Sequence, residues 1–500
     1  MKKNIIANLA GRFWSILSNF AFIPLYIKYL GFESYSVISF TLMITGIMAV
    51  LDGGLTATLS REFARKDNTE ADKYRTFRSL EAGYLLVVFL CIAIIFLASG
   101  YIGQHWISVK SFTPDQIALF LKIMSFEIGF QLLFRFYMGG LLGLEKQVEA
   151  NMYQIGWGIL RNGIVLLAVY FYPTLHTFFL WQMISTIMFT LLIKFALQRK
   201  ISTGSIIAFS IKVEKEVMQK VGKFAGGMML IALVSALNTQ MDKLTISKLL
   251  SLDNLGYYTL AVSLSQGLMV LVNPVATALL PRFTAYYSSH DKEKASQLFG
   301  QMNLLTSIVV FSFMAAIVFF SKDLIWIWTG DLVIAEKTNV TLSIVAFSYG
   351  MVAVQGLSYI IAISNGYTKL NNILGVSSLV LTIPSYIYFT KVYGAVGAAS
   401  VFCVIQTTTT VIYLYFINKI FINFAFFKEI FLKQFLLPLL LTLALGFLLF
   451  YSMPAFITEN RFLDLIWVGF CTLLICFISV VILLPKAEIK KIVSLLKFRN

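Results

Sequence analysis

The chain has 500 residues, of which 58% are hydrophobic and 13% charged, and its mean hydropathy is +0.81. A soluble protein of this length could not bury so much apolar surface, so the composition excludes a soluble globular protein and predicts a membrane protein. A net charge of +16 would point to nucleic acid in a soluble protein. Here the basic residues can set membrane topology instead, so we expect no nucleic-acid partner.

Apolar windows long enough to cross a bilayer recur along the whole chain. They cover residues 5–27, 35–59, 79–99, 117–139, 152–172, 177–197, 221–241, 256–280, 301–320, 339–362, 372–390, 395–417, 434–452 and 463–484. We therefore predict an all-α polytopic membrane protein with about 14 transmembrane helices. The first window follows a basic lead but contains Arg12 and lacks a cleavage signal, so we expect a retained span.

The distribution of basic residues predicts the orientation in the membrane. With the N-terminus in the cytoplasm, 26 of the 40 Lys and Arg residues fall in cytoplasmic segments, 8 in the opposite loops and 6 inside spans. Cytoplasmic segments are enriched in basic residues, so both termini are expected in the cytoplasm. The tail after Pro485 mixes apolar residues with lysines, which favours a short helix on the inner leaflet.

A weak internal similarity at an offset of 220 residues predicts two parallel six-helix repeats. Tyr35-Ser36-Val37 corresponds to Leu255-Gly256-Tyr257, and Leu59 to Glu62 corresponds to Leu279 to Arg282. Parallel repeats place a binding site between them near the membrane midplane. The expected organisation is a first bundle at 1–200, a cytoplasmic linker at 201–220, a second bundle at 221–417, an accessory helix pair at 434–484 and a basic tail at 485–500.

Polar and charged residues inside the apolar windows are the main functional clue. A charge at the bilayer centre costs at least about 2.5–3.5 kcal/mol, so it normally faces protein or a water-filled cavity. In the first window, Arg12 shares a helical stripe with Asn8, Ser15 and Asn19. Further stripes occur in the second, fourth, fifth, seventh and eighth windows, namely Thr41, Thr45 and Asp52; Glu127, Gln131 and Arg135; Gln154, Trp157 and Arg161; Lys223, Asn238 and Asp242; and Thr259, Ser263, Gln266, Asn273 and Thr277.

Several charges inside the windows also have a structural interpretation, whereas Arg12 and Arg161 lie deeper and favour a functional role. Lys122, Lys194 and Lys223 lie near window ends, where their ammonium groups can reach the interface. Glu127 and Arg135 can neutralise charges on neighbouring helices, and Asp52 can cap the turn at Gly53-Gly54. The last two windows are almost purely apolar, which is typical of an accessory pair.

Cations outnumber carboxylates inside the windows, which predicts a cationic cavity and an anionic, phosphorylated substrate. Guanidinium groups bind phosphate oxygens through two parallel hydrogen bonds. We therefore expect a pyrophosphate group to bind Arg12, Arg135, Arg161 and Lys223. Trp14 and Trp157 lie near arginines and are candidates for sugar contacts. Asp52, Glu127 and Asp242 are candidates for coupling to protons or sodium.

Nothing in the sequence predicts a catalytic or metal centre. The four cysteines lie in apolar runs without paired spacing, the three histidines lie in separate loops, and no Walker A motif occurs. We expect no metal and no cofactor, and we do not expect an enzyme.

Two segments resemble the family of polysaccharide-biosynthesis flippases that includes O-antigen exporters. They are YLGFESYSVISFTLMITGIMAVLDGGLTATLSREFARKD after the first window, and NTQMDKLTISKLLSLDNLGYYTLAVSLS from Asn238 to Ser265. Ser36 stands where that family often has glycine, as Gly256 does in the second half. The resemblance implies the fold of the multidrug/oligosaccharidyl-lipid/polysaccharide exporter superfamily, in which two bundles form a V around a central cavity.

The resemblance also implies a function, namely translocation of undecaprenyl-pyrophosphate-linked oligosaccharide across the bacterial inner membrane. Synthesis enzymes are possible partners. The first rival is a cation-coupled multidrug antiporter, which generally has an acidic residue in the N-terminal bundle, where this chain has Arg12. The second rival is a membrane glycan polymerase or ligase, which needs a long outer loop. The longest outer loops here, near 100–116 and 321–338, have only about 17 residues.

Overall fold

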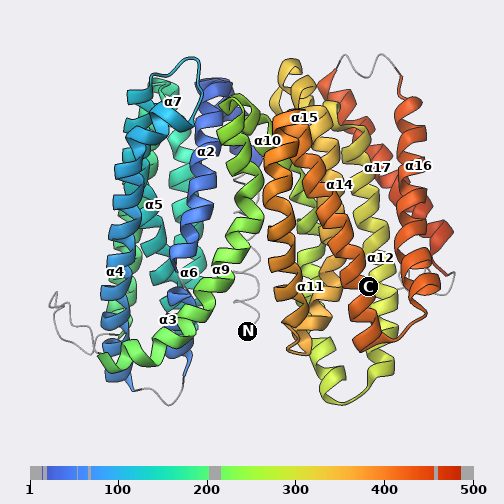
Figure 1. Ribbon diagram of the computed structural model, residues 1–500, viewed down its shortest axis with the longest axis horizontal. Helices are drawn as coiled ribbons and strands as arrows, with labels where there is room; N and C mark the ends of the chain where they lie inside the picture. Colours follow the sequence, from blue (N-terminus) through green and yellow to red (C-terminus); the bar gives the residue numbers. More distant parts are fainter. Residues whose placement is uncertain are drawn as a thin grey trace, which may run out of the picture. The chain divides into compact units, whose positions relative to one another are not determined.

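The computed structural model describes residues 14, 18, 20–52, 54–65, 69–201, 215–454 and 460–485, with the backbone alone for 215–231. The described part of the chain is helical almost throughout and contains no strand, which confirms an all-α fold (Figure 1). Internal contacts divide the chain into a first unit, Met1–Gly256, and a second unit, Tyr257–Asn500. The predicted linker and basic tail lie largely outside the described residues, and the predicted repeat boundaries stay a prediction.

The first unit is a bundle whose long helices lie roughly along one direction. A short apolar helix, Phe20–Leu30, comes first. The elements that follow are α2 (Phe32–Met48), η1 (Ala49–Asp52), α3 (Leu55–Ala64), α4 (Glu70–Tyr101), η2 (Ile102–Trp106), α5 (Pro114–Gly143), α6 (Gln147–Gly158), η3 (Ile159–Ile164), α7 (Val165–Phe171), α8 (Leu175–Ile201) and α9 (Lys215–Leu249). Helix α5 packs against α4 and α8, and α9 packs against α2 and η1.

Helix α10 (Leu252–Ser265) leads from the first unit into the second. The second unit then contains α11 (Gly267–Ser288), α12 (Lys292–Phe319), α13 (Ser321–Thr329), α14 (Leu332–Ser364), α15 (Lys369–Ile417), η4 (Asn418–Ile422), η5 (Phe426–Leu436), α16 (Leu437–Tyr451) and α17 (Arg461–Leu483). Helix α14 is central, because α11, α12, α13 and α15 all pack against it.

Eleven helical segments of the described residues are long and apolar enough to cross a membrane. One of them, Lys369–Ile422, contains two predicted spans, 372–390 and 395–417. They meet at Gly394, whose positive φ of 63° breaks the helix, a conformation that glycine adopts without strain. The predicted span 221–241 lies within α9, and most of the span 5–27 lies outside the described residues. The chain is therefore a multi-pass membrane protein.

Polar side chains fix several helix starts. Thr69 and Thr113 form capping boxes with Asp72 and Gln116, in which each side chain accepts from the other residue's backbone N–H. The Asn460 side chain caps α17 by accepting hydrogen bonds from the backbone N–H groups of Phe462 and Leu463. These caps satisfy N–H groups that have no partner within the helix.

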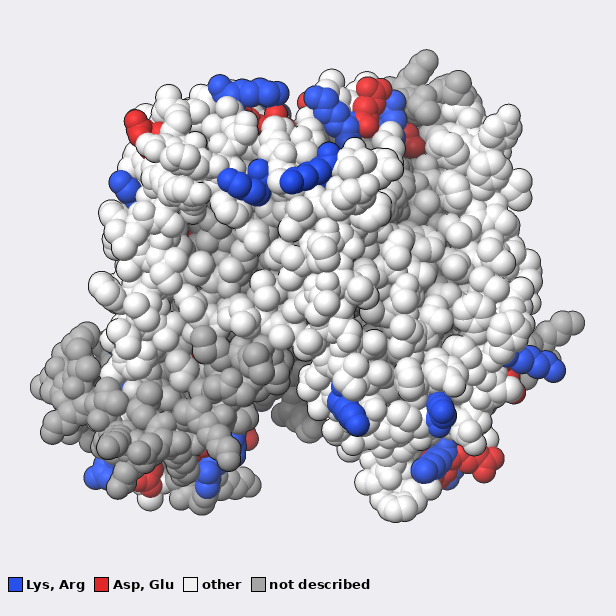
Figure 2. All heavy atoms as spheres, viewed as in Figure 1, with Lys and Arg blue, Asp and Glu red and all other residues white. Residues whose placement is uncertain are grey.

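The outer surface has the pattern expected of a protein in lipid. On the face shown in Figure 2, coloured charged side chains lie near the upper and lower edges, and the described surface between them is mostly white. Helix α4 exposes large apolar side chains over several turns, among them Leu86, Phe89, Leu90, Ile94 and Leu97. In water such a surface would be unfavourable, whereas lipid tails cover it without cost.

Candidate functional site

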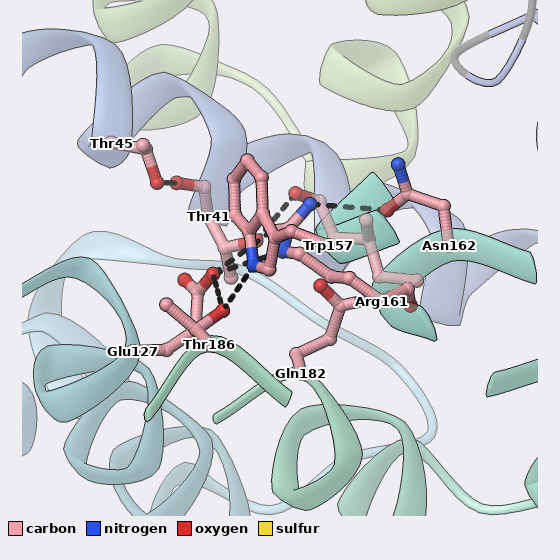
Figure 3. Close-up of polar contacts among 9 residues, drawn as sticks. Thr41, Thr45, Glu127, Trp157, Arg161, Asn162, Gln182 and Thr186 are labelled. Carbon is pink, nitrogen blue, oxygen red and sulfur yellow. Dashed lines mark hydrogen bonds and ion pairs between the residues drawn. The ribbon is translucent and has the colours of Figure 1, made fainter. Parts of the chain in front are cut away.

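A buried ion pair between α5 and η3 is the central feature of the first unit. The guanidinium of Arg161 contacts Glu127 Oε1 through Nη2 at 3.0 Å and Nε at 3.1 Å (Figure 3). The Glu127 side chain is 5% exposed and that of Arg161 is 17% exposed. The structure therefore brings together two residues that were predicted separately, one for ion coupling and the other for pyrophosphate binding.

The local backbone of η3 places Arg161 at this point. This segment is a π-helix between the α-helical segments α6 and α7, and such wider turns often occur at functional sites. Neighbouring side chains hold its backbone: Gln182 Nε2 donates to the Arg161 carbonyl at 2.9 Å, and Trp181 Nε1 donates to the Leu160 carbonyl at 2.9 Å. The guanidinium Nη1 also donates to Asn162 Oδ1 at 3.1 Å.

Trp157 belongs to the same cluster. Its Nε1 donates to Thr186 Oγ1 at 3.1 Å, and its ring centroid lies 5.2 Å from the Arg161 guanidinium carbon. Phe134 packs against the indole at a centroid distance of 4.8 Å. Figure 3 shows the Thr186 hydroxyl joined to both the Trp157 indole nitrogen and the Glu127 carboxylate. The indole is thus held by packing and hydrogen bonding next to the charged pair.

Trp14 also reaches this region. A methyl group built on Gly158, one residue after Trp157, would lie 2.8 Å from Trp14 Nε1. This nitrogen is buried and has no hydrogen-bond partner among the described residues. Trp157 therefore lies about one helical turn before Arg161, and Trp14 lies against Gly158 of the same turn.

Asp52 occupies a second polar cluster, formed by η1, α3 and α4. Its Oδ1 accepts a hydrogen bond from Tyr84 at 2.7 Å and another from the Thr56 hydroxyl. Arg135 of α5 is close enough to interact electrostatically with Tyr84. The two clusters share helix α5, which carries both Glu127 and Arg135.

Arg135 differs from Arg161 because its side chain is exposed. It lies nine residues after the exposed Phe126, and at about 100° per residue the two side chains leave opposite faces of α5. Arg135 has no ion pair with any acidic residue in the described part of the chain. Its charge is therefore available on the side of α5 that faces away from the apolar surface of Phe126.

One charged pair was missed by the sequence analysis. Lys194, interpreted there as reaching the interface, contacts Glu81 Oε1 through Nζ at 2.9 Å, and Tyr137 donates to the same oxygen at 2.7 Å. Glu81 lies inside the window 79–99, so its position in an apolar run was the available signal. The pair leaves little net charge at this point.

The other predicted residues lie elsewhere or outside the described part. Asp242 of α9 is 7% exposed, and its Oδ1 accepts from the Lys243 backbone N–H at 2.7 Å. Arg12 lies outside the described residues, and the side chain of Lys223 is also not described.

Family models match most of the chain. The model described as "Polysaccharide biosynthesis protein" matches residues 1–287, which is more than half of the sequence. The chain belongs to this family. A second model, MatE, matches residues 225–387. These matches confirm the resemblance that the two sequence segments indicated.

Individual relatives agree with this assignment. A Shigella flexneri protein named "Putative O-antigen transporter" is 19% identical over 402 residues, which cover 79% of this chain and 93% of that protein. The lipid II flippase MurJ, in an inward closed conformation, aligns with a TM-score of 0.74 and 17% identity over 96% of this chain and 98% of its own. An inward-facing multidrug resistance MATE transporter aligns with a TM-score of 0.63 and 12% identity, over 81% of this chain and 93% of the transporter's chain. This polysaccharide biosynthesis family member therefore has the fold shared by lipid flippases and multidrug transporters.

Proposed function

We propose that the protein moves undecaprenyl-pyrophosphate-linked oligosaccharide across the bacterial inner membrane by alternating access. The observation that carries the proposal is the placement of Arg161 in a membrane-embedded cluster, beside Glu127 and Trp157, with the exposed Arg135 two turns further along α5 than Glu127. Guanidinium groups bind phosphate oxygens with directed, charge-assisted hydrogen bonds. The family and the O-antigen transporter relative support a lipid-linked glycan as the substrate.

The Glu127–Arg161 pair provides a way to bind and release an anion. In the absence of substrate, Glu127 neutralises a guanidinium that would otherwise be costly to bury. A pyrophosphate can replace the carboxylate as the partner of Arg161, and a proton or sodium ion on Glu127 would favour that exchange. Substrate binding and cation binding would then favour each other, because both release the same ion pair.

The multidrug antiporter is the weaker candidate on this chemistry. Cationic drugs need a carboxylate that is free to pair with them. In the first unit, Glu127 pairs with Arg161, Glu81 pairs with Lys194, and Asp52 accepts two hydroxyl hydrogen bonds. Within the apolar window 117–139 of α5, the exposed charged side chain is the cation Arg135.

The test compares variants of Arg161 in a host whose own copy has been deleted. Lipid-linked oligosaccharide would be quantified on each membrane face together with surface glycan. We expect Arg161→Ala to accumulate substrate on the cytoplasmic face and Arg161→Lys to retain partial export, because a point charge replaces only part of a bidentate site. Protein level in the membrane is measured for every variant.

A matched control is available in the Lys200–Glu149 ion pair, whose Nζ–Oε2 distance of 2.9 Å is similar but whose side chains are 31% and 33% exposed. Lys200→Ala should leave export unchanged. Normal surface glycan in the deletion strain, combined with altered sensitivity to cationic drugs, would replace the flippase assignment by drug export.

A further inference from the structure

Helix α11 of the second unit has one exposed face that is polar along most of its length. Gln266, at its N-cap, and Asn273, Thr277 and Thr284 are all exposed. At 100° per residue these four side chains leave the helix within about 40° of one another, over about 27 Å. We call this set of four residues the α11 polar face.

The α11 polar face is unlike the lipid-facing surface of other helices. Between Leu233 and Leu332, none of the described residues is an exposed large hydrophobic, although α11 belongs to the membrane-spanning segment Leu252–Ser288. Helix α4, by contrast, exposes seven large apolar side chains between Leu86 and Tyr101. Polar groups at membrane depth face protein or a water-filled cavity rather than lipid. The composition of this face is therefore that of a surface in contact with water or a polar ligand.

Two prolines increase the hydrogen-bonding capacity of the same face. Pro274 and Pro281 lie within α11 and have no N–H to donate to the carbonyls of Val270 and Thr277. Both carbonyl residues lie on the same side of the helix as Asn273 at 100° per residue. The Asn273 amide itself makes no hydrogen bond to the residues that the structure describes. Hydrogen-bond donors and acceptors are thus available together on the α11 polar face.

Most of the α11 polar face lies in surroundings without formal charge. Residues 257–281 of α10 and α11, 338–368 of α14 and 392–418 of α15 contain no Asp, Glu, Lys or Arg. The exposed Arg282 lies near the Thr284 end of the face. Gln266 Nε2 donates to the Tyr349 hydroxyl of α14 at 3.2 Å, and the Tyr349 ring lies 5.6 Å from that of Phe402 of α15. An amide, a phenol and an aromatic pair therefore meet at the Gln266 end of the face.

We propose that the α11 polar face and Tyr349 bind the sugar residues of the transported lipid, an inference that rests on the proposed function. Sugar hydroxyls donate and accept hydrogen bonds, as do the side-chain amides of Gln266 and Asn273. Aromatic rings such as those of Tyr349 and Phe402 pack against the apolar faces of sugar rings.

Other ligands fit this chemistry less well. A pyrophosphate needs cations and a cationic drug needs a carboxylate, and the central parts of these three helices have neither. A polyprenyl chain needs an apolar surface, whereas this face is polar. A neutral, hydroxyl-rich ligand leaves no charge unpaired here.

The experiment measures binding to the purified full-length protein with three probes. They are undecaprenyl pyrophosphate without sugar, the same lipid carrying the host's oligosaccharide, and the free oligosaccharide. The variants are Asn273→Leu, which keeps the side-chain size, and Asn273→Ser, which keeps a hydrogen-bonding group. Asn372→Leu removes an exposed amide from α15 and serves as the matched control. Thermal unfolding without ligand verifies that each variant is folded.

We expect Asn273→Leu to weaken binding of the oligosaccharide-bearing lipid at least about tenfold, the effect of losing one or two hydrogen bonds. Binding of the sugar-free lipid should be unchanged, Asn273→Ser should be intermediate, and Asn372→Leu should match the wild type. Equal loss for both lipids, or no loss for the oligosaccharide-bearing lipid, would overturn the inference. If the wild type bound neither lipid, the proposed function would fail. Loss of free-oligosaccharide binding in Asn273→Leu would even then support sugar recognition at this face.

Discussion

The hydroxyl of Ser36 lies directly against the backbone of Gly256, 220 residues further along the chain. A methyl group built on Gly256 would overlap Ser36 Oγ and approach the Phe32 ring at 3.1 Å. The same offset of 220 residues relates the two similar sequence segments, so the positions that correspond in sequence meet in space.

This contact predicts that the sizes of the two residues are linked. Gly256→Ala should lower the free energy of unfolding by about 1–3 kcal/mol, because the added methyl group overlaps a buried hydroxyl. Adding Ser36→Gly should restore most of that loss, because it removes the overlapping atom. Thermal unfolding of the single and double variants measures the coupling. Gly100→Ala is the control, since a methyl group there meets nothing within 4 Å; additive effects of the two substitutions would contradict the prediction.

Variants of the Glu127–Arg161 pair should distinguish its role in folding from its role in transport. Glu127→Leu alone leaves a buried guanidinium unpaired and should lower the free energy of unfolding by about 3–5 kcal/mol. The double variant Glu127→Leu/Arg161→Met removes both charges, so it should recover much of that stability while export stays lost. Unfolding measurements combined with surface-glycan analysis check both parts. Recovered export in the double variant would mean that the pair acts only in folding.

Arg135 should affect transport without affecting stability. Its side chain is exposed and has no carboxylate partner among the described residues, so Arg135→Ala leaves no buried charge behind and should change the free energy of unfolding by less than about 0.5 kcal/mol. We expect export to fall markedly in Arg135→Ala and less in Arg135→Lys, because lysine keeps the charge. The measurements are membrane protein level and substrate distribution between the two faces. Unchanged export in Arg135→Ala would remove this residue from the pyrophosphate site.

We expect the protein to become more stable when Asp464 is substituted. It lies in the first turn of α17, is fully buried, and neither carboxylate oxygen has a hydrogen-bond partner among the described residues. Asp323 of α13 adds repulsion, and burial raises the pKa of Asp323 itself. Burying an ion costs several kcal/mol, more than the 0.3–1 kcal/mol or so that the helix dipole returns.

Asp464→Asn should therefore raise the free energy of unfolding by about 1–3 kcal/mol at neutral pH, because the amide has the same shape without the charge. Thermal unfolding of the purified protein measures it. A lower unfolding temperature in Asp464→Asn would show that the carboxylate has a stabilising partner.

The sequence alone determined the class of the molecule. Apolar windows of about 20 residues have one stable solution in a bilayer, because every backbone N–H and C=O must be satisfied within a helix. The positions of Arg161, Glu127 and Arg135 were visible for the same reason, since charges stand out in apolar runs. Asp464 was equally visible in the window 463–484, but the last two windows were interpreted as almost purely apolar.

Only the tertiary structure decided which charges neutralise each other. Helical spacing places Glu127 and Arg135 on one helix, but it carries no information on the π-helical turn that brings Arg161 to Glu127 or on the pairing of Lys194 with Glu81. It likewise cannot distinguish the polar stripe of α11, which stays exposed, from that of α5, most of which is buried. Partners in this bundle come from residues tens of positions apart, and their distances depend on helix packing, which a one-dimensional periodicity does not contain.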